Sequence, residues 1–320
     1  MESGAKARIA VVGSLVMDLV LWLPHFPRRG ETLHPTRFEI FAGGKGFNQA
    51  VTARRLGAEV GMIGRVGNDA FGDRFFEHLR REGIDPRHIS RDPELGTSLG
   101  IPMIDPQGEN SIIGVPLANT RLTPAEIDAG QDLIQASQVL LLQLEIPVGT
   151  SIRAAAIARA AGASVILNPA PAHQPVGPFF DLQPDQEPYL DWLIANEIEA
   201  EMLSGMRVSD LNGARQAARA LLARGVRRGV VVTLGQQGAL AVTPQVERHG
   251  PPFQVTLVDP TGAGDAFCGA WAVAMAEGMS VEEALRFSNA AGAVCVTQAG
   301  AEPSLPRREA VEALTGSKPV

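Results

Sequence analysis

A glycine-rich turn near residue 262 combines a potential anion site with a carboxylate. The apolar run 253–258 reads as a strand, and Gly262-Ala263-Gly264-Asp265 then opens a stretch rich in Ala, Phe and Trp that reads as a helix. Glycines let the backbone approach a ligand closely, and the N–H groups of a first helical turn attract anions. Asp265 in that turn is placed to accept a proton from an attacking hydroxyl group. On this motif alone, a simple helix-capping role is the favoured interpretation.

A second glycine-rich loop lies near the N-terminus. Gly43-Gly44-Lys45-Gly46 precedes a predicted helix that carries Asn48 on its first turn. Such a loop brings backbone N–H groups, an ammonium group and an amide against a polar ligand. Taken alone, it fits a tight connection with a solvated lysine equally well.

The turn around residue 262 also has some likeness to a dinucleotide-binding fingerprint. Phe267 stands where that fingerprint needs its third glycine, and no Gly-Lys-Ser/Thr element occurs in the chain. A nucleotide-binding dehydrogenase is therefore a remote alternative.

These motifs must be positioned by an alternation of short apolar runs and amphipathic stretches. Strands are predicted at 9–12, 60–63, 139–142, 165–167, 193–195 and 230–233. Helices are predicted at 48–56, 71–82, 124–135, 151–161 and 214–223. Capping boxes that begin at Thr123 and Ser280, and helix-ending glycines at 57 and 83, support these boundaries. The alternation predicts an α/β fold with a doubly wound, mainly parallel sheet and helices on both faces.

Two segments interrupt the alternation. Residues 19–41 and 97–115 each contain two apolar runs around a turn, which predicts two hairpin-like excursions. Together they would form a small sheet that stands over the active face as a lid.

Composition sets limits on the class of protein. The 320 residues are 45% hydrophobic and 20% charged, with a net charge of −7, which argues against broad binding to nucleic acid or an anionic membrane. No linker or repeat divides the chain, so we expect one domain over 1–320. We expect no signal peptide and no membrane span. The two cysteines, Cys268 and Cys295, are expected to be buried and free, as in a cytoplasmic protein.

The motifs also occur in a familiar order. The chain resembles the ribokinase-like (pfkB-type) carbohydrate kinase family over nearly its whole length. The matching elements are Gly13-Ser14-x-x-x-Asp18, Gly43-Gly44-Lys45-Gly46-x-Asn48-Gln49-Ala50, Gln143-Leu144-Glu145, Asn168-Pro169-Ala170-Pro171, Asn196-Glu197-Ile198-Glu199, Thr233-Leu234-Gly235-Gln236-Gln237-Gly238 and the Gly-Ala-Gly-Asp turn.

The resemblance implies a three-layer αβα fold with a β-sheet lid, formed here by about 16–41 and 97–119. It implies ATP-dependent transfer of the γ-phosphoryl group to a hydroxymethyl group of a pentose, ribose or 2-deoxyribose. Asp265 would be the base, and the N–H groups of Gly262, Ala263 and Gly264 would stabilise the developing charge. The sugar would be bound by Val16, Asp18, Gly44, Lys45, Gly46, Asn48, Glu145 and Asp265.

By the same resemblance, ATP and Mg²⁺ would be bound beside the turn. The nucleotide residues would be Asn196, Glu199, Thr233, Leu234, Gly235, Gln236, Gln237, Gly238, Gly264 and Asn289. Asn289 could instead be a helix-surface amide. An activating monovalent cation, K⁺, would be bound by Asp259, Thr261, Cys295, Gln298, Gly300 and Ser304, mainly through backbone carbonyls.

Three positions depart from the family's ribose-phosphorylating pattern. Val16 replaces an asparagine two residues before Asp18, where deoxyribose-phosphorylating relatives also have an apolar residue, and an isopropyl group cannot bond a sugar hydroxyl. Phe47 replaces a small residue, and the stretch 115–119 is short and poor in glycine. A nucleoside kinase, with Phe47, Trp22 and Phe41 stacking on a base, is the main alternative, followed by another sugar kinase or a non-catalytic sugar or nucleotide sensor. A homodimer through the lid is expected.

Overall fold

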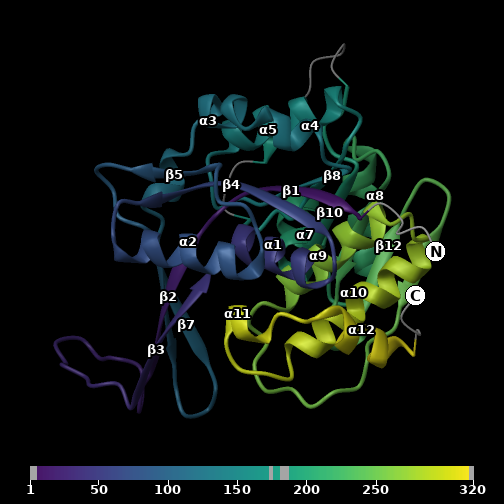
Figure 1. Ribbon diagram of the computed structural model, residues 1–320. Coiled ribbons are helices and arrows are strands. Elements are labelled where there is room, and N and C mark those ends of the chain that lie inside the picture. The colour runs from purple at the N-terminus through teal and green to yellow at the C-terminus, as the bar shows by residue number, and fades with distance from the viewer. Residues whose placement is uncertain (1–5, 173–175, 181–186, 317–320) are drawn as a thin grey trace.

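The structure, a computed structural model, describes residues 6–172, 176–180 and 187–316. Its larger sheet has the strand order β13-β12-β11-β10-β9-β8-β1-β4-β5 (Figure 1). All neighbours from β5 to β11 are parallel, whereas β12 and β13 are antiparallel. The strands are β1 (Arg8–Val12), β4 (Glu59–Gly67), β5 (Ile89–Asp92), β8 (Val139–Leu142), β9 (Ser164–Leu167), β10 (Trp192–Asn196), β11 (Gly229–Thr233), β12 (Ala239–Val242) and β13 (Glu247–Gly250).

Helices cover both faces of this sheet. One face carries α1 (Lys45–Arg55), α2 (Ala70–Glu82), α9 (Ala263–Ala276), α10 (Val281–Cys295) and α12 (Arg308–Thr315). The other carries α3 (Pro124–Ala129), α4 (Gln131–Gln135), α5 (Val148–Ala160), α6 (Gly177–Phe180), α7 (Glu197–Ser204) and α8 (Leu211–Ala223). Ile9 and Val11 of β1 belong to the first core, and Ala10 and Val12 to the second, as alternation along a strand requires. The predicted three-layer αβα architecture is confirmed.

The order of the strands determines where a ligand can bind. The chain builds the sheet outward from β1 through β4 to β5, and then in the opposite direction through β8, β9, β10 and β11. Loops that follow parallel strands on the two sides of such a reversal diverge and leave a crevice at the carboxyl ends. Ser14, Glu145, Asn168, Asn196 and Thr233 all lie at or just after the carboxyl end of a strand.

A smaller sheet lies beside this edge. It contains β2 (Val16–Trp22), β3 (Arg37–Gly43), β6 (Ser98–Ile104) and β7 (Asn110–Val115) in the order β3-β2-β6-β7. The hairpins β2–β3 and β6–β7 are antiparallel, as predicted, and β2 pairs with β6 in parallel. Figure 1 shows this small sheet extending away from the main body. Its strands leave Phe38, Ile112 and Ile113 more than half exposed.

Two predicted elements are wrong. The helix predicted over 124–135 is two helices, because the backbone of Gly130, with φ −104° and ψ 15°, leaves the helical conformation between them. The strand predicted over 253–258 has no regular structure. Leu257 and Val258 are each 57% exposed, and the Val258 N–H group donates to the carbonyl of Val296 rather than to a strand.

Other predicted features are confirmed. Both capping boxes are present, and Gly83 ends α2 in the left-handed conformation. Cys268 and Cys295 are buried free thiols. In the part of the chain that the structure describes, no helix is long and apolar enough to cross a membrane. Two single-turn helices, η1 (Ala118–Arg121) and η2 (Gly235–Gln237), and the short α11 (Ala301–Ser304) complete the elements.

Candidate active site

Both oxygens of the Asp265 carboxylate are held by amides. Asp265 lies on the first turn of α9 and is buried; its Oδ2 accepts a hydrogen bond from Asn48 Nδ2 at 2.9 Å, and its Oδ1 accepts one from Gln49 Nε2 at 3.1 Å. Both amides lie near the start of α1, which packs along α9. The helix itself begins at Gly262, with φ +84° and no side-chain cap. The carboxylate is thus oriented by another helix, and the helix-capping alternative does not describe it.

A second layer of amides holds Gln49. Its Nε2 also donates to Asn168 Oδ1 at 3.2 Å, and its Oε1 accepts a hydrogen bond from Gln143 Nε2 at 2.6 Å. Sequence reasoning gave Gln49, Gln143 and Asn168 no role of their own. A usable signal was present, because Gln143 and Asn168 directly follow the apolar strands β8 and β9, where a buried amide needs a partner.

Asp265 opens onto a cavity of about 220 Å³ at the carboxyl ends of the strands. The cavity is lined by Lys45, Asn168, Ala170, Ile194, Ala195, Asn196, Glu199, Thr233, Gly262, Gly264, Asp265 and Cys268. Seven of the residues singled out from the sequence thus come together, although they are spread from Lys45 to Asp265. The remaining predicted nucleotide residues, 234–238 and Asn289, lie outside the lining of this cavity.

The cavity contains opposite charges in a buried setting. Burial lowers the pKa of Lys45, but the carboxylates of Asp265, Glu145 and Glu199 outweigh burial, and the pKa lies above its usual value. Burial is also the main reason why the pKa of Glu199 is raised. The ammonium group therefore stays charged and can attract an anionic ligand.

Asn196 and Glu199 form a reciprocal cap at the start of α7. Asn196 Oδ1 accepts a hydrogen bond from the Glu199 N–H group at 2.8 Å, and the Asn196 N–H group donates to Glu199 Oε2 at 3.0 Å. The Asn-x-x-Glu element thus fixes its own geometry. Both residues line the cavity.

The loop before α1 closes tightly on the end of β1. Glu145 Oε2 accepts hydrogen bonds from the Lys45 N–H group at 2.9 Å and from the Ser14 hydroxyl. A Cβ at Gly46 would lie 2.5 Å from the Ser14 nitrogen, and one at Gly44 (φ +90°) would lie 2.7 Å from the Val16 nitrogen. The glycines are required because the two backbones touch here.

Asp18 projects from β2 between the backbones of both neighbouring strands. A Cβ at Gly43 would lie 2.3 Å from Asp18 Oδ2, and one at Gly100 would lie 2.2 Å from Asp18 Oδ1. Burial, with contributions from the charges of Glu145 and Asp265, raises the pKa of Asp18 to about 7. Val16 lies two residues earlier in β2 and therefore on the same face of the small sheet.

Comparison with known proteins identifies the family. Residues 6–308 match the model of the pfkB family carbohydrate kinases. The chain belongs to this family. A deoxyribokinase of Salmonella typhi is 36% identical over 94% of this chain and 96% of its own, and a ribokinase of Haemophilus influenzae is 37% identical over 95% and 97%. The structure of an Arabidopsis thaliana ribokinase complexed with ribose and ATP has a TM-score of 0.88, with 32% identity over 97% of this chain and 99% of that one.

The family membership makes the protein a phosphotransferase with an alcohol acceptor, and the fold agrees with that of the ribokinases. One departure from the family pattern now has an explanation. Phe47 is fully buried on the core side of α1, with its ring edge-on to Phe75 at 5.2 Å. The interpretation of Phe47 as a stacking residue for a base is wrong. Its spacing from the equally buried Val51, four residues later, is the signal that places it in the core.

The two other aromatic residues also have protein partners. The guanidinium group of Arg37 lies over the Trp22 ring, 4.3 Å from its centroid. Phe41 of β3 approaches Gly300, so that a Cβ on that glycine would contact the ring at 3.4 Å. The alternative of a nucleoside kinase is thus weakened, because Phe47 is buried and both Trp22 and Phe41 already contact other residues of the protein.

The proposed nucleotide loop is a tight turn. The Leu234 N–H group donates to the Gly238 carbonyl at 2.8 Å, and Gly238 has φ +83° because its backbone lies against Gly250. Asn289 Nδ2 donates to the carbonyls of Gly250 and Pro251 at 2.9 and 3.1 Å. Asn289 thus ties α10 to the end of β13, and its contact with a nucleotide stays a prediction.

Five of the six residues predicted to bind a monovalent cation are linked around α11. Asp259 accepts hydrogen bonds from the N–H groups of Thr261 at 2.9 Å and Gly300 at 2.8 Å. Cys295 Sγ lies 3.5 Å from the Thr261 carbonyl and 3.1 Å from the Ser304 hydroxyl. Each Asp259 oxygen uses one acceptor position and keeps another, and the carbonyls add further oxygens. This donor set fits a hard cation, whereas among the described residues Gln298 is connected to the set only through its N–H group and the Cys295 carbonyl.

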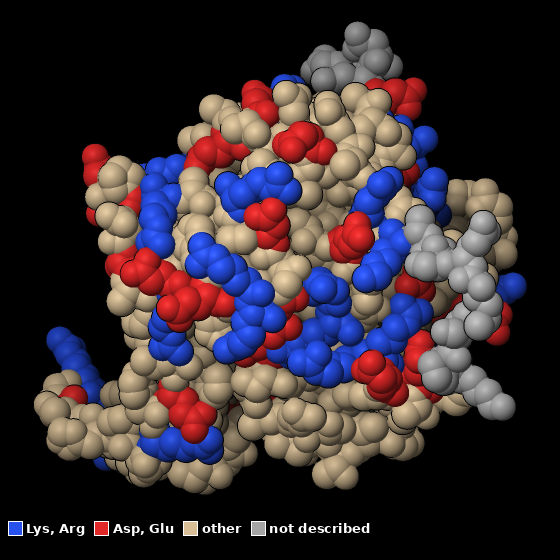
Figure 2. Space-filling view, in the orientation of Figure 1, with Lys and Arg blue, Asp and Glu red and all other residues tan. Residues whose placement is uncertain are grey.

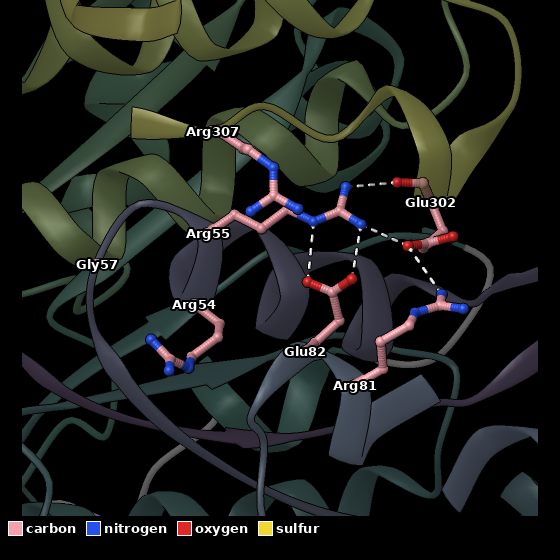
Figure 3. Close-up of a pocket in the computed structure, with 7 residues that line it drawn as sticks. All are labelled: Arg54, Arg55, Gly57, Arg81, Glu82, Glu302 and Arg307. Carbon is pink, nitrogen blue, oxygen red and sulfur yellow. Dashed lines mark hydrogen bonds and ion pairs between the residues drawn. The ribbon is translucent and has the colours of Figure 1, made fainter. Parts of the chain in front are cut away.

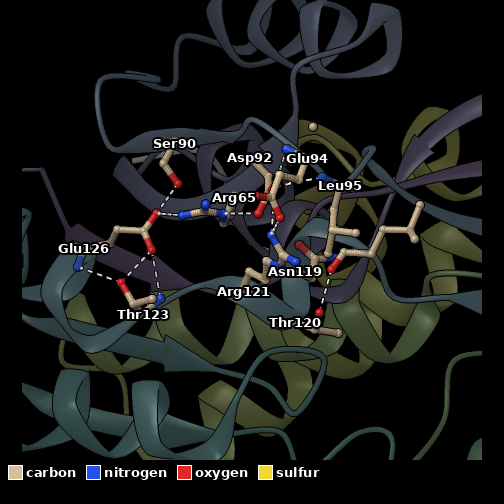
Figure 4. A network of polar contacts seen from close by, with 12 residues as sticks. Arg65, Ser90, Asp92, Glu94, Leu95, Asn119, Thr120, Arg121, Thr123 and Glu126 are labelled. Atoms are coloured by element: carbon tan, nitrogen blue, oxygen red, sulfur yellow. Dashed lines mark hydrogen bonds and ion pairs between the residues drawn. The ribbon is translucent and has the colours of Figure 1, made fainter.

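A polar network fixes the start of the small sheet. Asn119 is buried and bonds both backbone groups of Leu15: its Oδ1 accepts from the N–H group at 3.2 Å, and its Nδ2 donates to the carbonyl at 3.0 Å. Figure 4 shows Asn119 beside a charged cluster in which Arg65 joins Asp92 and Glu126, at 3.0 and 2.7 Å. The residue before Val16 is therefore attached to the main body.

Proposed function

We propose that the protein is an ATP-dependent pentose kinase that transfers the γ-phosphoryl group to the hydroxymethyl group of ribose or 2-deoxyribose. The observation that carries the proposal is the Asp265 carboxylate, held by Asn48 and Gln49 at the mouth of the anion-attracting turn. A base that is already oriented needs no rearrangement before it takes a proton. The names of the relatives, ribokinase and deoxyribokinase, support a pentose as acceptor.

Each residue of the site has a chemical task in this proposal. Asp265 takes the proton from the sugar hydroxyl as its oxygen attacks phosphorus. The N–H groups of Gly262 and Gly264 and the Lys45 ammonium group stabilise the charge on the transferring oxygens. The Ala263 N–H group donates to the Pro260 carbonyl at 3.3 Å, a long bond that it can exchange for a phosphate oxygen. Asp18 and Glu145 accept hydrogen bonds from sugar hydroxyls, with Gly44, Gly46 and Asn48 around them.

Nucleotide and metal would lie on the opposite side of the turn. Asn196, Glu199, Thr233, 234–238 and Asn289 would line the nucleotide site. Mg²⁺ neutralises phosphate charge when it is bound, and Glu199 with Asn196 offers the oxygen and amide groups that hold its water shell. K⁺ would be held by the residues around α11, where it would fix the dipoles of the 262–264 turn. Replacing Na⁺ by K⁺ at equal ionic strength should raise turnover, and an identical rate in both salts would contradict this assignment.

The small sheet would act as the lid within a single domain over 1–320. Its face carries Val16 and Asp18, so closure would bring it onto the sugar. The exposed Phe38, Ile112 and Ile113 would pair with a second copy in a homodimer. The two free thiols fit the reducing cytoplasm, where we propose that the enzyme works.

A coupled assay of ADP formation with ribose, 2-deoxyribose, hexoses and nucleosides tests the proposal. We expect the two pentoses to give the highest kcat/KM. Val16 removes the amide that would bond a 2-hydroxyl group, so 2-deoxyribose should equal or exceed ribose. Phosphorylation of a nucleoside or hexose but of neither pentose would contradict the assignment.

A further inference from the structure

A second cavity, of about 540 Å³, lies away from the candidate active site. It is formed where α1 and α2 end and where the chain passes from α11 to α12. The lining residues are Arg54, Arg55, Gly57, Arg81, Glu82, Glu302 and Arg307 (Figure 3). Four arginines face two glutamates, which leaves an excess of two positive charges in a protein whose net charge is −7. We call this cavity the arginine pocket.

One of these arginines is structural. Arg55 pairs with Glu82 at 2.8 Å and with Glu302, and its Nη1 donates to the carbonyls of Glu302 and Leu305 at 2.8 and 3.0 Å. Arg81 lies 3.6 Å from the Glu302 carboxylate. The charges of Arg55 and of the two glutamates are therefore paired with one another, and these pairs hold α11 against α1 and α2.

The other arginines have unused donors. Arg54 uses Nε to bond the Gly83 carbonyl at 3.2 Å, and no hydrogen bond within residues 6–316 that are described engages its two terminal nitrogens. Arg307 is exposed, and across the same described ranges its guanidinium group has no hydrogen bond or ion pair, although its charge contributes, after that of Arg55, to the lowered pKa of Glu82. Figure 3 shows both guanidinium groups beside the cavity, with no dashed contact to the other residues drawn. Arginines in a last helical turn can serve the helix dipole, but this does not explain Arg307, which precedes a helix.

We propose that the arginine pocket binds the phosphate group of a small phosphorylated metabolite. Guanidinium groups match the geometry of phosphate oxygens and bond them in pairs. The cavity has the size of a small-molecule site, so it can hold a polar body as well as the phosphate. On this face, Figure 2 shows Lys and Arg side chains gathered in the region where Figure 1 places α2, α11 and α12.

The pocket is connected to the candidate active site through two elements. α1 carries Lys45, Asn48 and Gln49 at its start and Arg54 at its end. α11 carries Glu302 on the pocket side, between Gly300 and Ser304 of the proposed cation site. A phosphate that competes with Glu302 for the arginines would change the environment of that loop. The ligand would then alter turnover without contact with the sugar or ATP.

Calorimetry on the full chain tests the site. The candidate active site is first filled with Mg²⁺, a non-hydrolysable ATP analogue and ribose or 2-deoxyribose, and glucose 6-phosphate, inorganic phosphate or glucose is then titrated in. We expect one equivalent of glucose 6-phosphate to bind and glucose not to bind. If glucose 6-phosphate binds more tightly than inorganic phosphate, the sugar part of the ligand also contacts the cavity. If the two bind equally, only the phosphate group is recognised. Both results support the site.

Two variants and a control locate the binding. Arg307→Gln removes a guanidinium group that makes no hydrogen bond, so the fold should be little affected, and Arg54→Gln removes a guanidinium group whose two terminal nitrogens are unused. Each should weaken binding by about tenfold or more, the value of a charge-assisted hydrogen bond. Arg228→Gln makes the same change of charge beside Asp191, far from the pocket, and should leave binding unchanged. Equal affinity in wild type and Arg307→Gln, or no phosphate binding at millimolar concentration, would overturn the proposal. Because binding is measured directly, the result does not depend on which sugar the enzyme phosphorylates.

Discussion

Asp265 and Asp18 are two aspartates close enough for their charges to interact, but their carboxylates have different surroundings. Asp265, on the main body, has an amide donor on each carboxylate oxygen. The carboxylate of Asp18, on the small sheet, accepts no hydrogen bond from the residues that the structure describes, and it lies against the backbone of two glycines. One carboxylate is oriented by donors from the protein, and the other has no such donor among the described residues.

The difference matches the two tasks proposed for them. A base must be in position when the hydroxyl arrives, and fixed amides provide this without reorganisation. A carboxylate that recognises the substrate contributes most to binding when it has no partner in the protein. An unsatisfied buried carboxylate is energetically costly, and the substrate's hydroxyl groups relieve that cost. The raised pKa of Asp18, about 7, reflects that cost. The predictions below test this contrast.

The largest effect should come from Asp265→Asn. The amide cannot accept the proton, so kcat should fall by roughly 10²–10⁴, while binding of ATP, measured by calorimetry, should change little. The fold should persist, because the substitution keeps the size of a side chain between two amides. A variant with more than half of the wild-type kcat would show that Asp265 is not the base.

The amide layer behind Asp265 should matter for stability as well as rate. Gln49→Leu would leave Asp265 Oδ1, Asn168 Oδ1 and Gln143 Nε2 without their partner. We expect a loss of about 2–4 kcal/mol in the free energy of unfolding, measured by urea titration, together with a lower kcat. Gln135→Leu, at an exposed position on α4, is the matched control and should cost less than about 0.5 kcal/mol. Equal stability of the two variants would show that the layer does not orient Asp265.

The Asp18 carboxylate should give the sugar step a pH dependence. Sugar hydroxyls donate to the ionised form, so kcat/KM for the sugar should rise by roughly tenfold per pH unit below about 7 and level off above it. Asp18→Asn should flatten this limb of the profile.

Stability should respond to pH in the opposite sense. The folded pKa of Asp18 is raised from 3.8 to about 7, so the folded state binds the proton more tightly than the unfolded state. The contribution of Asp18 is therefore present at low pH and is lost as the pH rises through about 7. Urea titrations at pH 5 and pH 8 should show a smaller difference in Asp18→Asn than in wild type. An unchanged difference would mean that Asp18 titrates near its ordinary pKa.

The same contrast explains what could be predicted from the sequence. Strand runs, capping boxes and the ordered motifs gave the layers of the fold and the residues that meet at the cavity. The direction in which a side chain points from a helix was harder to predict. Phe47 and Asn48 are neighbours in the loop motif, but Phe47 points into the core and Asn48 points toward Asp265. Residues 253–258 show a further limit: an apolar run predicts a strand only where another strand is available to pair with it, and here the helix end at Val296 takes the backbone bond. The hydrogen bonds that link Gln143, Gln49 and Asn168 join the ends of two strands and the start of a helix. They could not be predicted from any one local stretch of sequence.

The smallest effect should come from Val16, which lies on the same face of β2 as Asp18. Val16→Asn restores an amide where a 2-hydroxyl group would lie, and one hydrogen bond to a neutral hydroxyl contributes about 0.5–1.5 kcal/mol. The ratio of kcat/KM for ribose to that for 2-deoxyribose should therefore rise a few-fold to roughly tenfold. Val16→Ala is the matched control: it opens space beside Gly44 and Gly100 without adding a donor, and it should leave the ratio near the wild-type value. If both variants shift the ratio equally, space and not hydrogen bonding decides between the sugars. If neither variant shifts the ratio, Val16 does not face the 2-position of the sugar. The sugar would then bind in another orientation, and the contrast between the Asp265 and Asp18 carboxylates would be unaffected by this result.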